Sequence, residues 1–180
     1  HVGSFFLQSG LRPGLADLFA RARAKGVTTS LDAGYDDSET WDFGIKDVLA
    51  QTDVFLPNEV EASAITGLDS MEEAALELSK LCRICVVKCG PAGVVVASEG
   101  EVFAAPTFDA IVRDTTGAGD SFNAGFLYAF LQGKTLRDAA DYGNACGSVS
   151  VTRLGGASSC ASLAEAEEVI RTGGTAFLEK

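Results

Sequence analysis

The most informative segment of the chain reads Asp114-Thr115-Thr116-Gly117-Ala118-Gly119-Asp120. It stands between an extended segment and an apolar stretch whose periodicity predicts a long helix over 118–132. The two glycines allow consecutive backbone N–H groups to point into one space, and the positive end of the helix dipole lies behind them. The segment therefore predicts an anion-binding hole, with the Asp120 carboxylate beside it in a position to take a proton from a hydroxyl.

A simpler interpretation of the same segment is an ordinary helix start. In that case Thr115 or Thr116 caps the first turn, and Asp120 only complements the helix dipole. A short Gly-Ala-Gly-Asp turn would leave the two interpretations evenly balanced. All seven positions together arise by chance on the order of once in a million chains of this length, which favours the functional interpretation.

Outward from this segment, strand-like and helix-like stretches alternate along the chain. The predicted strands are 2–7, 27–32, 53–56 and 84–88, with a hairpin of 93–98 and 101–104. The predicted helices are 12–25, 40–50, 58–66, 71–81, 118–132, 135–152 and 163–171. This alternation predicts an α/β protein with a mostly parallel sheet between two helical layers, formed by 1–180 as a single domain. Ligands of such sheets bind at the carboxyl ends of the strands.

Composition and charge exclude several classes of function. The chain has 25 Asp and Glu against 14 Lys and Arg, a formal charge of −11, and no basic cluster. We therefore expect no nucleic-acid partner and no anionic membrane partner, because both require local basic residues. The single histidine is His1, so any general base must be a carboxylate. An odd number of cysteines without an export signal favours reduced thiols and a cytoplasmic location.

The segment 114–120 closely resembles the C-terminal signature of the ribokinase-like (PfkB) carbohydrate kinases, Asp-Thr-x-Gly-Ala-Gly-Asp. The continuation Ser121-Phe122-Asn123-Ala124-Gly125-Phe126 also resembles theirs. Further stretches agree in order and spacing along essentially all 180 residues, but only with the later part of a family member. The resemblance implies a ribokinase-like α/β/α fold without the N-terminal part and lid. It also implies ATP-dependent phosphorylation of a hydroxyl on a sugar or sugar-like substrate.

The resemblance implies a role for each matching position of the catalytic segment. Asp120 would be the base that deprotonates the acceptor hydroxyl, and Gly117, Ala118 and Gly119 would form the anion hole for the transferring phosphoryl group. The stretch 56–61 resembles the Asn-x-x-Glu motif of the family, so Asn58 and Glu61 would help to hold Mg²⁺ and the phosphates. The same two residues also fit a capping box at a helix start, and both interpretations can hold at once.

The nucleotide and a monovalent cation have candidate residues as well. The stretch 86–93 resembles the strand and Gly-x-x-Gly turn beside ATP, with Gly90 and Gly93 allowing close backbone approach and Lys88 able to face the triphosphate. A plain hairpin turn and a solvated lysine are the alternatives. The stretch 151–159 resembles a segment that holds K⁺ in many members, or it is an ordinary loop between helices. The candidate K⁺ ligands are Asp114, Thr116, Ser150, Gly155 and Ser159.

Some features leave the assignment open. Gly34 stands where many sugar-kinase members have Asn in an Asp-x-Asn motif, so only the Asp of that motif, Asp32, is present here. A vitamin-type kinase acting on a hydroxymethylpyrimidine or pyridoxal is one alternative, and a non-catalytic nucleotide-binding relative is another. The cofactors expected are ATP and Mg²⁺, with K⁺ possible, and the full-length protein is a candidate homodimer.

Overall fold

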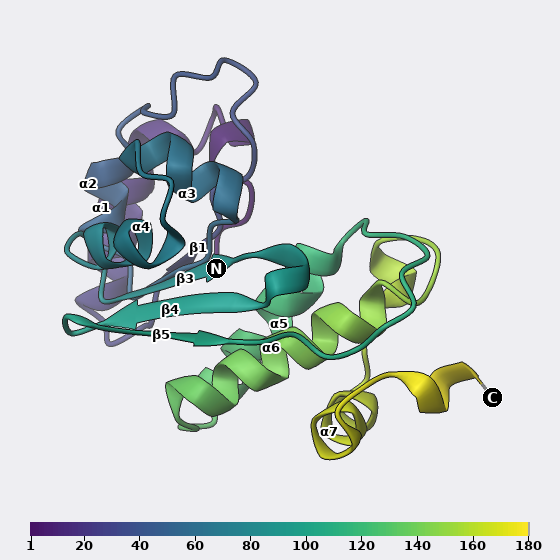
Figure 1. Cartoon of the computed structure of the whole chain (residues 1–180). Coiled ribbons are helices and arrows are strands. Elements are labelled where there is room, and N and C mark those ends of the chain that lie inside the picture. Colours follow the sequence, from purple (N-terminus) through teal and green to yellow (C-terminus); the bar gives the residue numbers. More distant parts are fainter. Residues whose placement is uncertain (180) are drawn as a thin grey trace. The chain divides into compact units, whose positions relative to one another are not determined.

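Five strands form one sheet, in chain order, in the computed structural model, which describes residues 1–179 (Figure 1). They are β1 (Ser30–Leu31), β2 (Val54–Phe55), β3 (Ile84–Lys88), β4 (Val94–Ser98) and β5 (Glu101–Ala105). The first three are parallel, with Ser30 opposite Val54 and Val54 opposite Ile84. The connections from β3 to β4 and from β4 to β5 are too short for a crossover, which makes these pairs antiparallel. The α/β prediction is confirmed, but the sheet is mixed rather than mostly parallel.

The chain divides into two compact units, and each is described by itself. The first contains residues 1–89 and 95–103, and the second contains 90–94 and the described residues from 104 onward. The helices of the first unit are α1 (Arg12–Arg23), α2 (Ile45–Leu49), α3 (Glu59–Thr66) and α4 (Met71–Leu78). Both α3 and α4 pack against β3. The apolar core of this unit includes the fully buried Phe5, Leu31 and Phe55.

The predicted first strand is wrong over most of its length. Only Val2 bridges to β1, at Leu31, and the chain then turns at Ser4, which has a φ of +54°. Residues Phe5–Leu7 form a 3₁₀ helix, η1. The physical reason lies in burial: Phe5 and Phe6 are both buried, and consecutive residues of a strand point to opposite faces. A helical turn places both rings in the core.

The segment 40–50 is helical only at its end, because α2 begins at Ile45. Before it, Glu39, Trp41 and Phe43 have positive φ values, which a helix does not accept. The Asp36 carboxylate accepts hydrogen bonds from the N–H groups of Ser38 and Trp41, at 3.0 and 2.8 Å, and holds this loop in place. The strands β1 and β2 are shorter than the strands predicted at 27–32 and 53–56.

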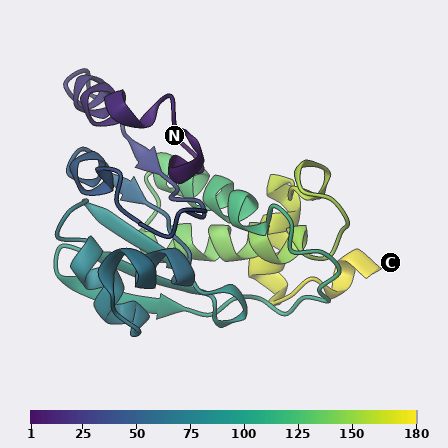
Figure 2. The ribbon, with the colours of Figure 1, turned by 90° about the horizontal axis from the view of Figure 1, so that it is seen from above.

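The helices of the second unit match their predictions closely. They are α5 (Ala118–Leu131), α6 (Leu136–Ser150) and α7 (Leu163–Thr172), with 3₁₀ turns η2 (Gly90–Ala92), η3 (Ala157–Ser159) and η4 (Ala176–Glu179). α5 and α6 lie side by side, as Figure 2 shows. A Cβ on Gly125 would lie 2.5 Å from Tyr142 O, and one on Gly143 would lie 2.8 Å from the Phe122 ring. Glycine at these positions permits the close approach of the two helices.

Within residues 1–179, no helix has the length and apolar character needed to cross a membrane.

Candidate active site

The first candidate region is the start of α5 in the second unit. Gly117 is the N-cap residue, with a φ of +76°, and no side chain caps the helix. The interpretation of Thr115 or Thr116 as the cap is therefore wrong. Among the described residues, the N–H groups of Gly119 and Asp120 have no hydrogen-bond acceptor, and both residues are exposed. Free N–H groups at the positive end of a helix form an anion-binding site.

Close packing of two loops fixes this turn. A Cβ on Gly117 would lie 2.9 Å from the Cα of Gly156 and 3.2 Å from its carbonyl carbon. The methyl group of Thr116 would be 3.4 Å from a Cβ on Gly156. The turn before α5 thus rests on the backbone of the loop that follows α6.

Asp114 joins the same two loops by hydrogen bonds. Its Oδ1 accepts from the Thr116 N–H and its Oδ2 accepts from the Gly155 N–H, each at 2.9 Å. These bonds, that from Gly155 first, lower the pKa of Asp114 below its usual value. Asp114, Thr116 and Gly155, three of the candidate K⁺ ligands, therefore lie together.

The other two candidate K⁺ ligands form a buried pair. The hydroxyl oxygens of Ser150 and Ser159 are 2.9 Å apart, and Ser159 Oγ also donates to the carbonyl of Gly156 at 2.7 Å. Gly156 lies against Thr116, so this pair is close to the loop held by Asp114. All five residues thus belong to one local arrangement rich in hydroxyl and carbonyl oxygens.

The turn around Gly90 and Gly93 also belongs to the second unit. Gly93 has a φ of +92°, and a Cβ there would lie 2.1 Å from the carbonyl oxygen of Ala105. Gly90 has a φ of +50° but open space around it. Sequence reasoning missed Asn144, whose buried Nδ2 donates to the carbonyls of Ala105 and Pro106 at 3.3 and 3.0 Å. This amide fixes the segment that Gly93 contacts.

In the first unit, a buried ion pair lies at the carboxyl ends of β1 and β3. Lys88 Nζ is 2.7 Å from Asp32 Oδ2, and the two side chains are only 13% and 12% exposed. Asp32 Oδ1 accepts from the Gly34 N–H at 3.1 Å. The interpretation of Lys88 as a solvated lysine is therefore wrong, and Asp32 is its partner.

Asn58 and Glu61 lie at the start of α3, and the capping box predicted for them is present. Asn58 Oδ1 accepts from the Glu61 N–H at 2.9 Å, and Glu61 Oε2 accepts from the Asn58 N–H at 2.9 Å. Asn58 Nδ2 also donates to Glu61 Oε1 at 2.8 Å. Burial raises the pKa of Glu61; Asp32 acts in the same direction, while the Asn58 N–H and Lys88 oppose the rise. An isolated parallel bridge joins Asn58 to Lys88, so these four residues share one environment.

The family model for pfkB family carbohydrate kinases matches residues 1–163 of the chain. The chain belongs to this family. Among its curated relatives, it is 34% identical over 119 residues to a ribokinase from Haemophilus influenzae, covering 63% of the chain and 39% of that protein. It is 36% identical over 145 residues to an ATP-dependent ribose-1-phosphate kinase from Halopiger xanaduensis, covering 80% of the chain and 47% of that protein. The chain thus spans less than half the length of these two relatives.

Solved structures of family members are similar in fold. The ribokinase from Thermotoga maritima has a TM-score of 0.72 at 28% identity, over 86% of this chain and 52% of that one. The Arabidopsis thaliana ribokinase, complexed with ribose and ATP, has a TM-score of 0.78 at 26% identity, over 89% of this chain and 53% of that one. The Escherichia coli protein assigned as ribokinase II, in complex with ATP and Mg²⁺, has a TM-score of 0.76 at 27% identity, over 85% of this chain and 51% of that one.

Proposed function

We propose that the chain is the nucleotide-binding and catalytic portion of a kinase that transfers a phosphoryl group from ATP to a hydroxyl of a sugar or sugar-like molecule. The observation that carries this proposal is the start of α5. There, the unpaired N–H groups of Gly119 and Asp120 lie beside an exposed carboxylate in the first turn. The complexes of the relatives with ribose, ATP and Mg²⁺ support the choice of ligands.

In this proposal each residue of the α5 turn has one task. The Asp120 carboxylate accepts the proton of the acceptor hydroxyl, which makes the oxygen a better nucleophile toward the terminal phosphorus of ATP. The backbone of Gly117, Ala118 and Gly119 forms the anion hole for the transferring phosphoryl group; the Gly119 N–H is free to donate, whereas the Ala118 N–H donates to Thr115 O at 3.1 Å. Positioning and charge stabilisation account for most of the catalysis in phosphoryl transfer, so the rigidity of this turn is itself part of the mechanism.

The residues of the first unit suit a magnesium ion that is held by few protein ligands. No group of three or more His, Cys, Asp or Glu side chains suitable for a metal exists within residues 1–179. Mg²⁺ in kinases commonly uses only one or two carboxylates, together with water and phosphate oxygens. Glu61 and Asn58 offer such oxygens, and both Glu61 oxygens already accept hydrogen bonds, which fits contact through water. When bound, Mg²⁺ would neutralise phosphate charge.

The nucleotide and K⁺ assignments follow the same proposal. Gly90 and Gly93 would lie beside the nucleotide, and Lys88 would face the phosphates from its ion pair with Asp32. Asp114, with the residues that it joins, would hold K⁺ and so stabilise the turn before α5. Omitting K⁺ from a Na⁺-free assay tests this assignment: activity that does not respond to K⁺ would remove it.

The decisive experiment measures ADP release by the full-length protein over a panel of sugars, with hydroxymethylpyrimidine and pyridoxal included. We expect Asp120→Asn to lower kcat by roughly 10²- to 10⁴-fold, the usual contribution of a general base. Asp17→Asn, an exposed aspartate on α1, is the matched control and should have no effect. Unchanged turnover in Asp120→Asn would refute the role of that residue.

Two other outcomes of the panel separate the alternatives. Turnover of hydroxymethylpyrimidine or pyridoxal, with no turnover of any sugar, would indicate a vitamin-type kinase. Binding of Mg-ATP without turnover of any acceptor would indicate a non-catalytic relative.

A further inference from the structure

A small cavity lies at the amino ends of the parallel strands of the first unit, away from Asp32 and Lys88. Its volume is about 200 Å³, and it is lined by Arg23, Gly26, Val27, Thr28, Asp53 and Arg83. Asp53 immediately precedes β2 and Arg83 immediately precedes β3, whereas Asp32 and Lys88 lie at the opposite ends of their strands. The cavity is therefore separate from the residues to which the proposed function assigns roles, and we call it the amino-end cavity.

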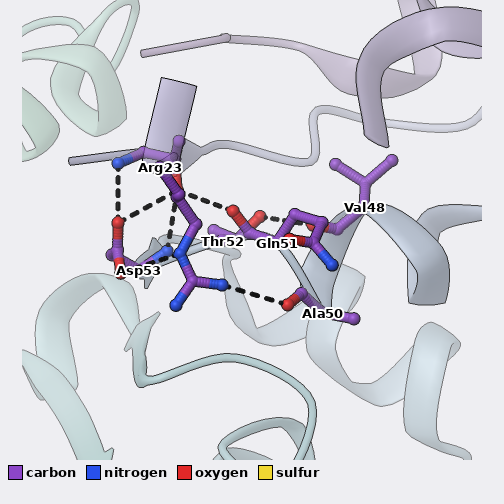
Figure 3. Close-up of polar contacts among 7 residues, drawn as sticks. Arg23, Val48, Ala50, Gln51, Thr52 and Asp53 are labelled. Atoms are coloured by element: carbon purple, nitrogen blue, oxygen red, sulfur yellow. Dashed lines mark hydrogen bonds and ion pairs between the residues drawn. The ribbon is translucent and has the colours of Figure 1, made fainter. Parts of the chain in front are cut away.

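Arg23, at the end of α1, lines this cavity, and Figure 3 shows its contacts with Asp53 and Ala50. Its Nε is 3.6 Å from Asp53 Oδ1, and its Nη1 donates to the carbonyl of Ala50 at 3.3 Å. The Ala50 carbonyl belongs to the C-cap residue of α2, an end of a helix that favours a cation. A guanidinium has five N–H donors, so donors remain for a further acceptor. These two contacts direct the guanidinium toward the cavity, although its side chain is 41% exposed.

The Asp53 carboxylate already accepts hydrogen bonds from other groups of the protein. Its Oδ2 accepts from the N–H and the hydroxyl of Thr29, at 2.9 and 3.1 Å, and its side chain is 12% exposed. These bonds hold the carboxylate against the start of β1. Its negative charge is offset by Arg23, so Asp53 does not neutralise a second arginine.

Arg83 is that second arginine, and its charge is not balanced. Among the residues described, no carboxylate lies within ion-pair distance of its guanidinium. Its backbone is anchored on both sides, since its N–H donates to Thr52 O at 3.3 Å and its carbonyl accepts from Ser98 Oγ at 3.1 Å. The amino-end cavity thus carries a net positive charge in a chain whose formal charge is −11.

We propose that the amino-end cavity binds a small oxyanion of the phosphate type between Arg23 and Arg83. Two guanidinium groups match the several oxygens of a phosphate, and arginine pairs with such oxygens through parallel N–H bonds. The volume is below the roughly 300–1,000 Å³ of pockets that enclose drug-sized ligands, which favours an ion or a single phosphate group over a nucleotide. This site is distinct from the phosphoryl-binding turn proposed at α5.

The test is an NMR titration of the ¹⁵N-labelled full-length protein with inorganic phosphate at constant ionic strength. We expect saturable shifts of the Thr28 amide and of the side-chain Nε signals of Arg23 and Arg83. Arg83→Gln should weaken this binding by at least about tenfold, the usual effect of losing a charge-assisted contact. Arg21→Gln, on the same helix as Arg23 but outside the cavity, is the matched control and should leave the affinity unchanged.

Three results would overturn the proposal: no saturable shift at these groups, the same affinity in Arg83→Gln, or equal shifts with chloride. Acetate should bind more weakly, and an affinity equal to that of phosphate would refute the phosphate preference. The amides of Gly119 and Asp120 report separately on the α5 turn in the same spectra. Failure of one site is therefore distinguishable from failure of the other.

Discussion

Replacement of Gly117 by alanine tests the packing that holds the turn before α5. The added Cβ would lie 2.9 Å from the Cα of Gly156, and neither atom belongs to a flexible side chain. Gly133 is the matched control, because its φ of +74° is nearly the same as the +76° of Gly117, while no atom lies within 4 Å of its would-be Cβ. The two substitutions share the torsional strain and differ in the contact.

The expected losses of folding free energy follow from these two contributions. A left-handed backbone costs a non-glycine residue about 1–2 kcal/mol, and the reduced freedom of the unfolded chain returns about 0.4–1 kcal/mol. Gly133→Ala should therefore cost about 1 kcal/mol. Gly117→Ala should add the cost of overpacking, typically about 1–3 kcal/mol, for a total of about 2–4 kcal/mol.

Urea denaturation followed by circular dichroism measures both losses, and titration with Mg-ATP tests the phosphate binding that we propose for the turn. We expect weaker Mg-ATP binding in Gly117→Ala and unchanged binding in Gly133→Ala. Losses that agree within about 0.5 kcal/mol would show that the contact with Gly156 does not contribute to stability.

Two further measurements test the buried groups. Burial raises the pKa of Glu61 above its unfolded value, so the folded state binds the proton more tightly. The free energy of unfolding should therefore fall as pH rises from 4.5 through the raised pKa. Glu61→Gln should flatten this slope in denaturation curves measured at several pH values, and an unchanged slope would contradict the prediction. Iodoacetamide near neutral pH should first modify the exposed Cys160, because Cys89 and Cys146 are shielded and have pKa values raised to about 11. Peptide mass spectrometry locates the label. Equal labelling of all three cysteines would contradict the prediction.

The helices of the second unit could be predicted from sequence because local signals agree with the final packing. The periodicity of 118–132 extends over several turns, and Gly117 in a left-handed conformation marks its start. The strand predicted at 2–7 and the first half of the helix predicted at 40–50 are wrong for a physical reason. Their side chains are apolar enough for a strand or helix, but Ser4, Trp41 and Phe43 adopt positive φ values, and the rings of Trp41 and Phe43 contact Phe6 and Arg12.

The candidate site could be predicted only where its residues are neighbours in sequence. The α5 turn and the Asn58 capping box are of this kind, with all of their groups a few positions apart. The ion pair of Lys88 with Asp32 joins residues 56 positions apart, and no local pattern indicates it. The family resemblance supplied the candidate residues at 150–159, whereas the contact that joins Asp114 to Gly155 became visible only in the fold.

The hydrogen bond from Gly155 to Asp114 also sets an order of events during synthesis of the chain. It closes a loop of 41 positions that contains the whole of α5 and α6, so both helices must be made before the turn can be anchored. At about 5–20 residues per second, residue 155 is added roughly 2–8 seconds after residue 114. For those seconds the nascent turn lacks its partner loop. The phosphoryl-binding geometry that we propose for this turn is therefore acquired late, after the helix pair behind the turn is complete.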